Sequence, residues 1–431
     1  MAYKGRVRPT IALTADDIAA DAVGSSEIAT DAVTANEIAA GAVASSEIAT
    51  DAVGIAELSA TGTADATTVL HGNNTWAAVT SLPTQTSNSG KTLITDGTDA
   101  SWTPRSGRNL MINGDFKVAQ RGASYTSTTP VTNDDDTYTL DRWVLLSDGD
   151  DIVDVTQSTS AIDTSGQYCC ALSVETANKK FGIFQMAERA NCVDFINTGD
   201  CTLSFKAKVT GSSLTNVKAA IVGWGSTQDT SVSDIVSAWN VAGTDPTLIA
   251  NWAYESTPAD LNLTGTVQTI SITAPVDSTA HVKNIGVFIW SDVTTTTVTD
   301  ELQIADVQFE RGSVATDFEH QKYSQVLLEC QRYYFEMDTS LAAYSTNGVV
   351  GFRWPQEMRI TPNIEWRYPN NTGTANNVYR IDTGGQTVLA SGNTQGKNVD
   401  GLVYWYNLTG GYANWATTAV MFWMSGEAEL D

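Results

Sequence analysis

A strictly alternating stretch decides the fold class of this chain. Residues 202–209 read Thr-Leu-Ser-Phe-Lys-Ala-Lys-Val, so apolar side chains at odd positions alternate with polar ones at even positions. Successive side chains of a β-strand point to opposite faces, which makes the pattern typical of a half-buried antiparallel strand. Further strands are predicted at 267–272 and 285–290, and the second is apolar on both faces and therefore central in its sheet.

The surrounding segment, residues 108–322, carries recurring turn signals and no long helical pattern. These features favour a β-sandwich of the jelly-roll type. Its last strand is expected at 302–310, where the apolar alternation slips between Ile304 and Val307. The slip predicts a β-bulge at Ala305 and Asp306.

Residues 14–60 contain a ten-residue repeat with a branched aliphatic residue at every fifth position. A step of five fits neither the period of a helix, about 3.6, nor that of a strand, about 2, so the chain must bend within each repeat. Thr14 with Asp17, and Thr34 with Glu37, have the spacing of a capping box, which predicts a single helical turn in each repeat. The aliphatic residues are Ile18, Val23, Ile28, Val33, Ile38, Val43, Ile48, Val53 and Leu58.

One such repeat buries almost nothing by itself, so its stability has to come from stacked repeats or from other chains. We expect a parallel trimeric shaft over residues 14–60. A disordered acidic linker and a single-chain solenoid are the alternatives. Residues 61–107, rich in Thr, Ser, Gly and Asn, are predicted to form a connector with short hairpins.

Residues 323–337 are the best helix candidate, because Tyr323, Leu327, Cys330 and Tyr334 share one helical stripe. We expect this helix to brace an aromatic-rich, β-rich C-terminal domain at 338–431. Aromatic faces stack on the CH groups of sugar rings, so its aromatic residues are candidates for glycan binding as a group, although any one aromatic residue at an alternating β position is more often a core residue. The candidates are Trp366, Tyr368, Tyr404, Trp405, Tyr406, Tyr412 and Trp415.

Composition excludes several classes of function. The 431 residues carry a net charge of −25, with no Lys or Arg between Arg8 and Lys91, which disfavours nucleic-acid binding. We expect no membrane insertion and no signal peptide, because no apolar stretch is long enough for either. The five cysteines lack metal-binding spacing and are expected to be buried free thiols. Three isolated histidines and no catalytic motif predict a protein that is not an enzyme and requires no cofactor.

Several motifs resemble the jelly-roll domain found in tail fibres of tailed bacteriophages. The opening residues are also similar to those of carbohydrate-binding jelly rolls that hold a structural calcium where the first and last strands meet. That second resemblance implies a possible calcium ion bound by Asp115 and Asp306, although those modules have a second acid where Ala305 stands. The motifs are 109–116 (Asn-Leu-Met-Ile-Asn-Gly-Asp-Phe), 120–122 (Gln-Arg-Gly), 138–143 (Tyr-Thr-Leu-Asp-Arg-Trp), 309–312 (Phe-Glu-Arg-Gly), 315–319 (Ala-Thr-Asp-Phe-Glu) and 330–334 (Cys-Gln-Arg-Tyr-Tyr).

The tail-fibre resemblance implies a homotrimeric virion protein, assembled in the host cytoplasm, that attaches the phage to bacterial surface polysaccharide without cleaving it. Residues 1–13, with Lys4, Arg6 and Arg8, would dock on phage tail or baseplate proteins. Weak sites repeated by three chains would then bind through avidity. The alternatives are a head or baseplate decoration fibre without a host ligand, and a polysaccharide depolymerase that uses a pair of carboxylates.

Overall fold

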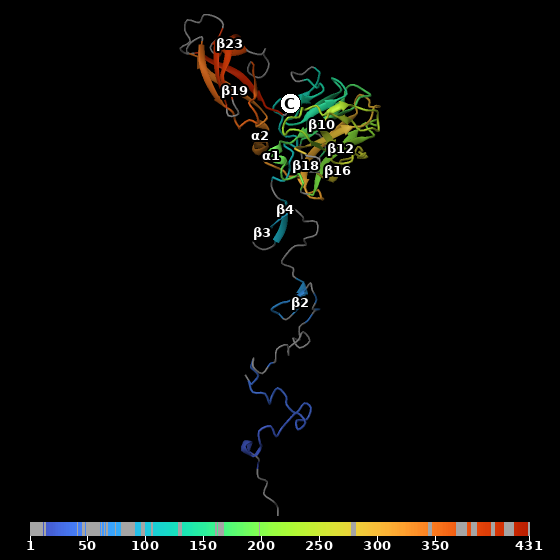
Figure 1. Cartoon of the computed structure of the whole chain (residues 1–431), viewed down its shortest axis with the longest axis vertical. Helices are drawn as coiled ribbons and strands as arrows, with labels where there is room; N and C mark the ends of the chain where they lie inside the picture. Colours follow the sequence, from blue (N-terminus) through green and yellow to red (C-terminus); the bar gives the residue numbers. More distant parts are fainter. Residues whose placement is uncertain are drawn as a thin grey trace, which may run out of the picture. The chain divides into compact units, whose positions relative to one another are not determined.

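The structure is a computed structural model (Figure 1). The chain forms two compact units, Met1–Pro83 and Thr84–Asp431. Of most residues between 338 and 426 only the backbone is described. The described residues are 12, 14–40, 42–44, 48, 61, 63, 65, 68–73, 75–78, 91–95, 100–104, 107–127, 132–159, 162, 168–197, 199–276, 282–343, 347–367, 377–380, 386–397, 401–408 and 418–429.

In the first unit the repeats form a series of tight turns, one every five residues. The first is the 3-10 turn η1 (Ala15–Asp17). The second and fourth turns each contain a residue with left-handed backbone, Asp21 (φ 60°) and Asp31 (φ 66°). The bend that the five-residue step predicts is thus present in the described repeats. A small hairpin of β1 (Thr68–Leu70) and β2 (Trp76–Ala78) follows. The turn hydrogen bonds run from Asp17 N to Thr14 O, Ala22 N to Ala19 O, Glu27 N to Gly24 O, Ala32 N to Ala29 O, Glu37 N to Thr34 O and Ala42 N to Ala39 O.

The second unit begins with the hairpin β3 (Lys91–Thr95) and β4 (Ala100–Pro104) and continues into two six-stranded antiparallel sheets. The first sheet has the order β15 (Trp252–Tyr254), β12 (Val217–Trp224), β17 (Asn284–Ser291), β10 (Phe181–Met186), β7 (Val144–Ser147), β6 (Thr137–Tyr138). The second has the order β16 (Gln268–Pro275), β11 (Asp200–Thr210), β18 (Glu301–Arg311), β9 (Cys169–Val174), β8 (Val153–Ser158), β5 (Ser124–Tyr125).

The connections confirm the predicted jelly roll. From β9 to β12, and again from β15 to β18, every connection crosses from one sheet to the other. If these eight strands are numbered one to eight along the chain, the two sheets read 1-8-3-6 and 2-7-4-5. That order is the double Greek key of a jelly roll. A short hairpin of β13 (Val236–Ala238) and β14 (Thr247–Leu248) interrupts the chain between β12 and β15.

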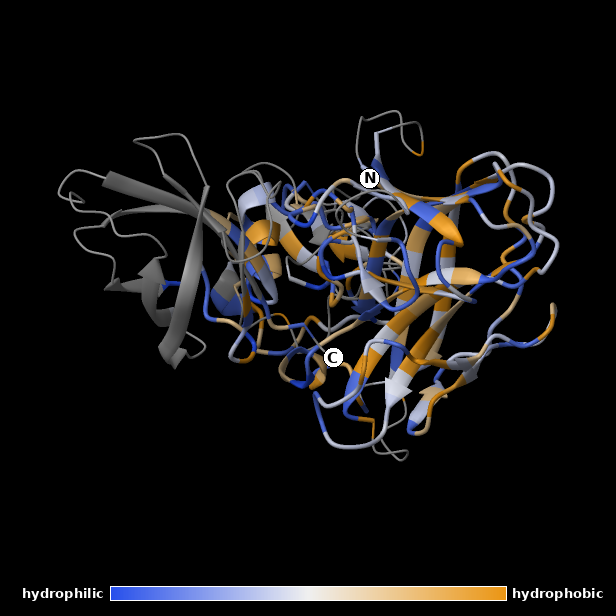
Figure 2. Ribbon diagram, turned by 90° about the horizontal axis from the view of Figure 1, so that it is seen from above, coloured by the Kyte–Doolittle hydropathy of each residue, from blue (hydrophilic) through white to orange (hydrophobic). Residues whose placement is uncertain are grey.

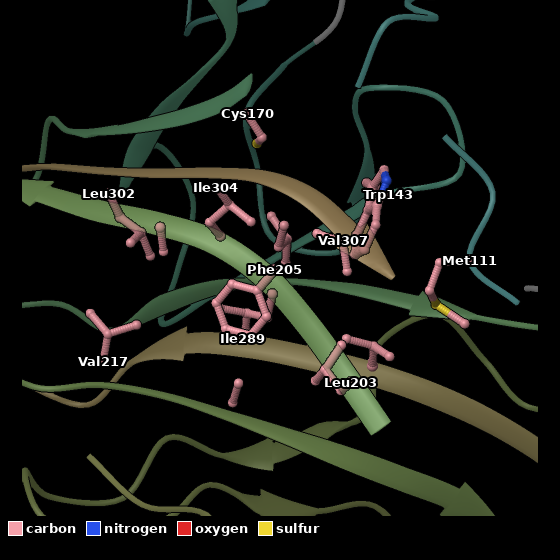
Figure 3. Close-up of a cluster of buried hydrophobic side chains, with 14 of the residues drawn as sticks. Met111, Trp143, Cys170, Leu203, Phe205, Val217, Ile289, Leu302, Ile304 and Val307 are labelled. Atoms are coloured by element: carbon pink, nitrogen blue, oxygen red, sulfur yellow. The ribbon is translucent and has the colours of Figure 1, made fainter. Parts of the chain in front are cut away.

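The main core lies between the two sheets and contains the stretch that predicted it. Leu203 and Phe205 of β11 are at most 1% exposed and pack with Ile289 and Ile304 (Figure 3). Figure 2 shows hydrophobic and hydrophilic positions alternating along strands of the sandwich. The predicted exposure of the even positions is wrong at Thr202 and Ser204, which are both buried. Thr202 donates a hydrogen bond to Gly312 O at 2.7 Å.

A second apolar cluster covers the outer face of the first sheet. Phe184, Phe288 and Trp290 point away from the main core and pack under residues 235–254, which include the β13–β14 hairpin. The sheet is therefore buried on both faces. This confirms the prediction that β17 is central, because all eight of its residues are buried.

Helices are short. α1 (Arg189–Cys192) follows β10, and α2 (Tyr323–Gln331) follows β18. The predicted helix over 323–337 is too long, because Tyr334 already begins strand β19 and pairs with Glu427. No helix among the described residues is long and apolar enough to cross a membrane.

The C-terminal segment folds as the expected β-rich domain, a seven-stranded sheet. Strand β25 is central, since it pairs with β19 along one edge and with β21 and β22 along the other. The strands are β19 (Tyr334–Ala343), β20 (Asn347–Arg353), β21 (Asn363–Arg367), β22 (Asn377–Arg380), β23 (Gln386–Lys397), β24 (Gly401–Leu408) and β25 (Thr418–Glu427).

All five cysteines are buried free thiols, as predicted. Burial raises the pKa of Cys192 to about 12 and of Cys169 to about 11, which keeps both protonated and unreactive at neutral pH.

Candidate functional site

The repeats expose an apolar row, which we define as the described aliphatic residues from Ile18 to Ile48. These seven side chains are between 44% and 54% exposed. Core side chains of this chain are less than a tenth exposed, so none of these seven side chains is buried within the single chain. The members are Ile18, Val23, Ile28, Val33, Ile38, Val43 and Ile48. Val53 and Leu58 lie outside the described residues.

Capping boxes hold the row in place. Thr34 N donates to Glu37 Oε2 at 2.7 Å, Thr14 N donates to Asp17 Oδ2 at 2.9 Å, and Gly24 N donates to Glu27 Oε2 at 2.8 Å. The hydroxyl and the backbone N–H of Thr34 lower the pKa of Glu37. The acidic residues of the repeat therefore close turns, and the predicted capping pairs are present in the structure.

The opening loop, residues 109–118, is pinned onto the last sandwich strand. Asn109 Nδ2 donates to Val307 O at 3.0 Å, and Asn109 Oδ1 accepts from Phe309 N and Met111 N, each at 3.0 Å. The loop therefore supplies backbone and amide contacts along β18.

The predicted bulge on β18 is present, displaced by one residue. Between the pairs Ser204↔Gln308 and Lys206↔Ala305, two residues of β18, Asp306 and Val307, face the single residue Phe205. Asp306 has left-handed backbone, φ 54°. The bulge turns the Asp306 side chain toward Lys206.

The two carboxylates expected to hold calcium do not form a typical calcium site. Asp115 Oδ2 lies 2.8 Å from Lys117 Nζ, and Asp306 Oδ2 lies 2.8 Å from Lys206 Nζ. Asp306 Oδ1 is buried without a hydrogen-bond partner, yet no group of three or more His, Cys, Asp or Glu among the described residues could hold a metal ion. Each carboxylate is already neutralised by an ammonium group, so this donor set fits Ca²⁺ poorly. The calcium ion stays a prediction.

The candidate glycan-binding aromatic residues lie on separate strands or outside the described residues. Trp366 lies in β21 opposite Met424, whereas Tyr404, Trp405 and Tyr406 lie in β24 between β20 and β23. Strands β21 and β24 are not neighbours in the sheet, so the backbone does not bring Trp366 next to the other three. Tyr368, Tyr412 and Trp415 lie outside the described residues, and sugar binding by this set stays a prediction.

Two motifs of the family resemblance form a buried charged junction between the sandwich and the C-terminal sheet. Arg121 Nη2 lies 3.2 Å from Glu429 Oε1, and Arg142 Nη1 pairs with Glu429 Oε2. Asp141 receives two hydrogen bonds from Gln120, each at 2.6 Å. All of these charged side chains are less than a tenth exposed.

Aromatic rings complete the junction. The guanidinium carbon of Arg142 lies 3.6 Å from the ring centre of Tyr333, and that of Arg121 lies 3.8 Å from that of Tyr334. Burial opposes the charge on Arg121, but Glu429 and Glu427 outweigh it and raise the guanidinium pKa. Sequence reasoning missed Glu429, because its partners stand about 300 residues earlier in the chain and no local pattern marks it.

Known proteins resemble this chain only distantly. No family model and no curated protein matches it. Among solved structures, the enzymatically active domain of tailspike protein 4 of bacteriophage CBA120 shares 14% identity over 48% of this chain and 24% of its own, with a TM-score of 0.28. This chain thus spans about a quarter of that tailspike chain.

Two further structures carry carbohydrate-related descriptions. A candidate sugar-binding protein of Bacteroides thetaiotaomicron shares 13% identity over 48% of this chain and 100% of its own, with a TM-score of 0.30. A carbohydrate-binding module of the β-sandwich superfamily shares 12% identity over 51% of this chain and 72% of its own, with a TM-score of 0.29.

Proposed function

We propose that this chain is a trimeric fibre of a phage virion that attaches the particle to bacterial surface polysaccharide by binding without turnover. The observation that carries the proposal is the apolar row, seven half-exposed aliphatic side chains at every fifth residue from Ile18 to Ile48. Aliphatic side chains exposed at such a regular interval favour an interaction surface.

A second and a third copy of the same repeat are the partners that fit this row best. The row is strictly periodic, so only a partner with the same period can cover all of it in register, and a parallel copy has that period by identity. Burying an aliphatic side chain fully contributes about 1.5–3 kcal/mol, and these are half-buried already, so about 1 kcal/mol for each residue remains to be gained. Over seven residues in each of three chains, the sum favours assembly.

The glycan-binding part of the proposal rests on the jelly roll and on the family resemblance of its opening and closing motifs. The first sheet offers no outer face for a ligand, since residues 235–254 cover it. Sugar contacts are therefore left to the outer face of the second sheet, where β16 has exposed positions, to the edges and loops of the sandwich, and to the C-terminal domain. Each site can be weak, because three copies on one fibre raise the effective concentration of the second and third contacts.

The experiment is binding of the purified full chain to an array of bacterial surface polysaccharides, together with an assay for released reducing ends. We expect binding to some polysaccharides and no release of reducing ends. Release of reducing ends would identify a depolymerase instead. Absence of binding to every polysaccharide and to intact bacteria would identify a decoration fibre.

A further inference from the structure

An open cavity of about 610 Å³ lies beside the jelly roll, where three segments distant in sequence meet. Each segment contributes one wall: the opening loop contributes Leu110, the α1 segment Phe195 and helix α2 Gln325. Its size lies within the range of about 300–1,000 Å³ that is common for small-molecule sites.

One wall of the cavity carries an unsatisfied acceptor. Glu188 is only 4% exposed, and its Oε2 accepts from Arg332 Nη2 at 3.1 Å. Its other oxygen, Oε1, is buried and has no hydrogen-bond partner among the described residues. Leaving a buried acceptor without a donor costs about 1–3 kcal/mol, more when the group is charged, so the site is suited to a ligand that brings a donor.

Arg332 is not free to serve that oxygen. Its Nε and Nη2 both point to Glu188 Oε2, and its Nη1 donates to Glu357 O at 3.2 Å. The guanidinium is therefore held on one side of the carboxylate. Glu188 lines the cavity, and its buried Oε1 is left without a donor among the described residues.

The rest of the lining combines an apolar floor with a polar rim. Leu110 and Phe195 are buried and apolar, whereas Asp194 and Gln325 are exposed and Glu329 is half-buried. The lining contains three carboxylates and one guanidinium, so its net charge is negative. Such a site repels anions and accepts hydrogen bonds from hydroxyl groups, while the floor suits the CH groups of a sugar ring.

We propose that this cavity binds one uncharged hexose unit of the glycan, with Glu188 Oε1 accepting from a sugar hydroxyl and Asp194 accepting from a second. The inference rests on the proposed function, which it deepens by assigning the sugar to the cavity between the opening loop, α1 and α2. The aromatic residues of the C-terminal domain are not needed for this contact.

The test uses the full chain and a substitution that fills the cavity. Ala190 is exposed and lines it, so Ala190→Trp places an indole ring in the space that the sugar would occupy. Ser324→Trp is the matched control, because Ser324 is also exposed, lies on α2 and is not part of the lining. The probes are the array polysaccharides, followed by calorimetric titration with glucose, galactose, mannose, N-acetylglucosamine and N-acetylneuraminic acid.

We expect Ala190→Trp to weaken binding of the array polysaccharides by at least about tenfold and Ser324→Trp to leave it within about twofold. A second variant, Asp194→Asn, keeps the shape and should weaken binding severalfold, whereas Asp150→Asn removes an exposed acid elsewhere and should not. If Ala190→Trp fails to fold, as judged by circular dichroism, the Asp194→Asn and Asp150→Asn pair decides the question.

The outcomes separate the two claims. Full binding by both cavity variants overturns this assignment and leaves the proposed function standing, with the sugar site elsewhere. Tighter binding of N-acetylneuraminic acid than of the uncharged sugars also overturns it, because the lining should repel a carboxylate. No binding of any polysaccharide by the unaltered chain overturns the proposed function and this assignment together.

Discussion

At the scale of single residues, Gly114 fixes how the chain enters the jelly roll. The Cβ of any larger residue at this position would lie 2.0 Å from Val307 O, a backbone atom that cannot move away without breaking the bulge on β18. Asn109 and Leu110 hold the same strand from the other end of the loop. Glycine is therefore required at position 114, because the loop backbone approaches the backbone of β18 too closely for a Cβ atom.

Gly114→Ala should destabilise the second unit by at least about 3 kcal/mol, because the loop or β18 has to shift to remove the overlap. Urea unfolding of the full chain, followed by tryptophan fluorescence, measures the loss. Gly265→Ala is the matched control, since its nearest atom would lie at an ordinary contact distance of 3.8 Å. Equal stabilities of the two variants would contradict the account of the opening loop.

Asp135 gives the fold a pH dependence. Burial raises its pKa to about 6, and the neighbouring carboxylate of Asp234 adds to the shift. The folded state therefore binds this proton more tightly than the unfolded state, so the contribution of Asp135 is most favourable below about pH 4 and is lost as the pH rises through 6.

Asp135→Asn should remove that loss and raise stability at pH 7.5 by about 1 kcal/mol, because the amide keeps the acceptor that receives Ser147 N at 2.7 Å. Melting temperatures measured between pH 4 and 8 check the prediction. The melting temperature of the variant should rise relative to that of the parent chain as the pH increases. A constant difference between the two melting temperatures over this range would show that Asp135 does not titrate as described.

At the scale of elements, the spacing of apolar residues correctly predicted strands whose burial follows from their local sequence. The alternation at 202–209 identified a core strand, and the continuous apolar run at 285–290 identified a central one. The helix at 323–337 was overextended, because Tyr334 fits the helical stripe by spacing but pairs with Glu427 in the structure. Its carbonyl also accepts from Gln120 Nε2 at 2.8 Å, a tertiary contact that no local pattern reveals.

The sequence predicted neither the segment that covers the first sheet nor the proposed sugar cavity, because no local pattern marks either of them. Residues 235–254 carry no pattern that tells which face they will cover. The cavity needs Leu110, Glu188 and Arg332 to meet, and these positions are separated by more than 70 residues at each step. Side chains of this kind become a site only through the crossing connections of the jelly roll.

The capping boxes of the repeats make a prediction for the turns. Glu37→Ala removes the acceptor of Thr34 N, so the amide proton of Thr34 should exchange with solvent faster, as measured by hydrogen exchange in NMR spectra of a full-chain sample. Glu37→Gln keeps an acceptor oxygen and should retain most of the protection. Unchanged exchange in Glu37→Ala would show that the carboxylate does not close the turn.

At the scale of the whole molecule, Glu429 joins the C-terminal sheet to the jelly roll. Its two oxygens serve Arg121 and Arg142, and all three side chains are at most 6% exposed. Removing one partner of a buried ion pair leaves an uncompensated charge, which typically costs about 3–5 kcal/mol.

Glu429→Ala should therefore lower stability by about 3 kcal/mol or more and make the segment between α2 and β19 sensitive to protease. Glu427→Ala is the control, since the Glu427 side chain is 42% exposed and its pair with Arg121 should contribute at most about 1 kcal/mol. Chemical denaturation and limited proteolysis of the full chain measure both effects. If the two variants lose equal stability, Glu429 is not the main contact of the junction.

The proposal that the molecule is a fibre rests on the apolar row. Its central claim is that two further copies of the chain cover this row. Sedimentation equilibrium of the full chain measures this directly. We predict a mass of three times the 46.0 kDa chain, which falls to that of one chain when Val23, Val33 and Val43 are replaced by Ser. A mass of 46.0 kDa for the unaltered chain at micromolar concentration would contradict the account.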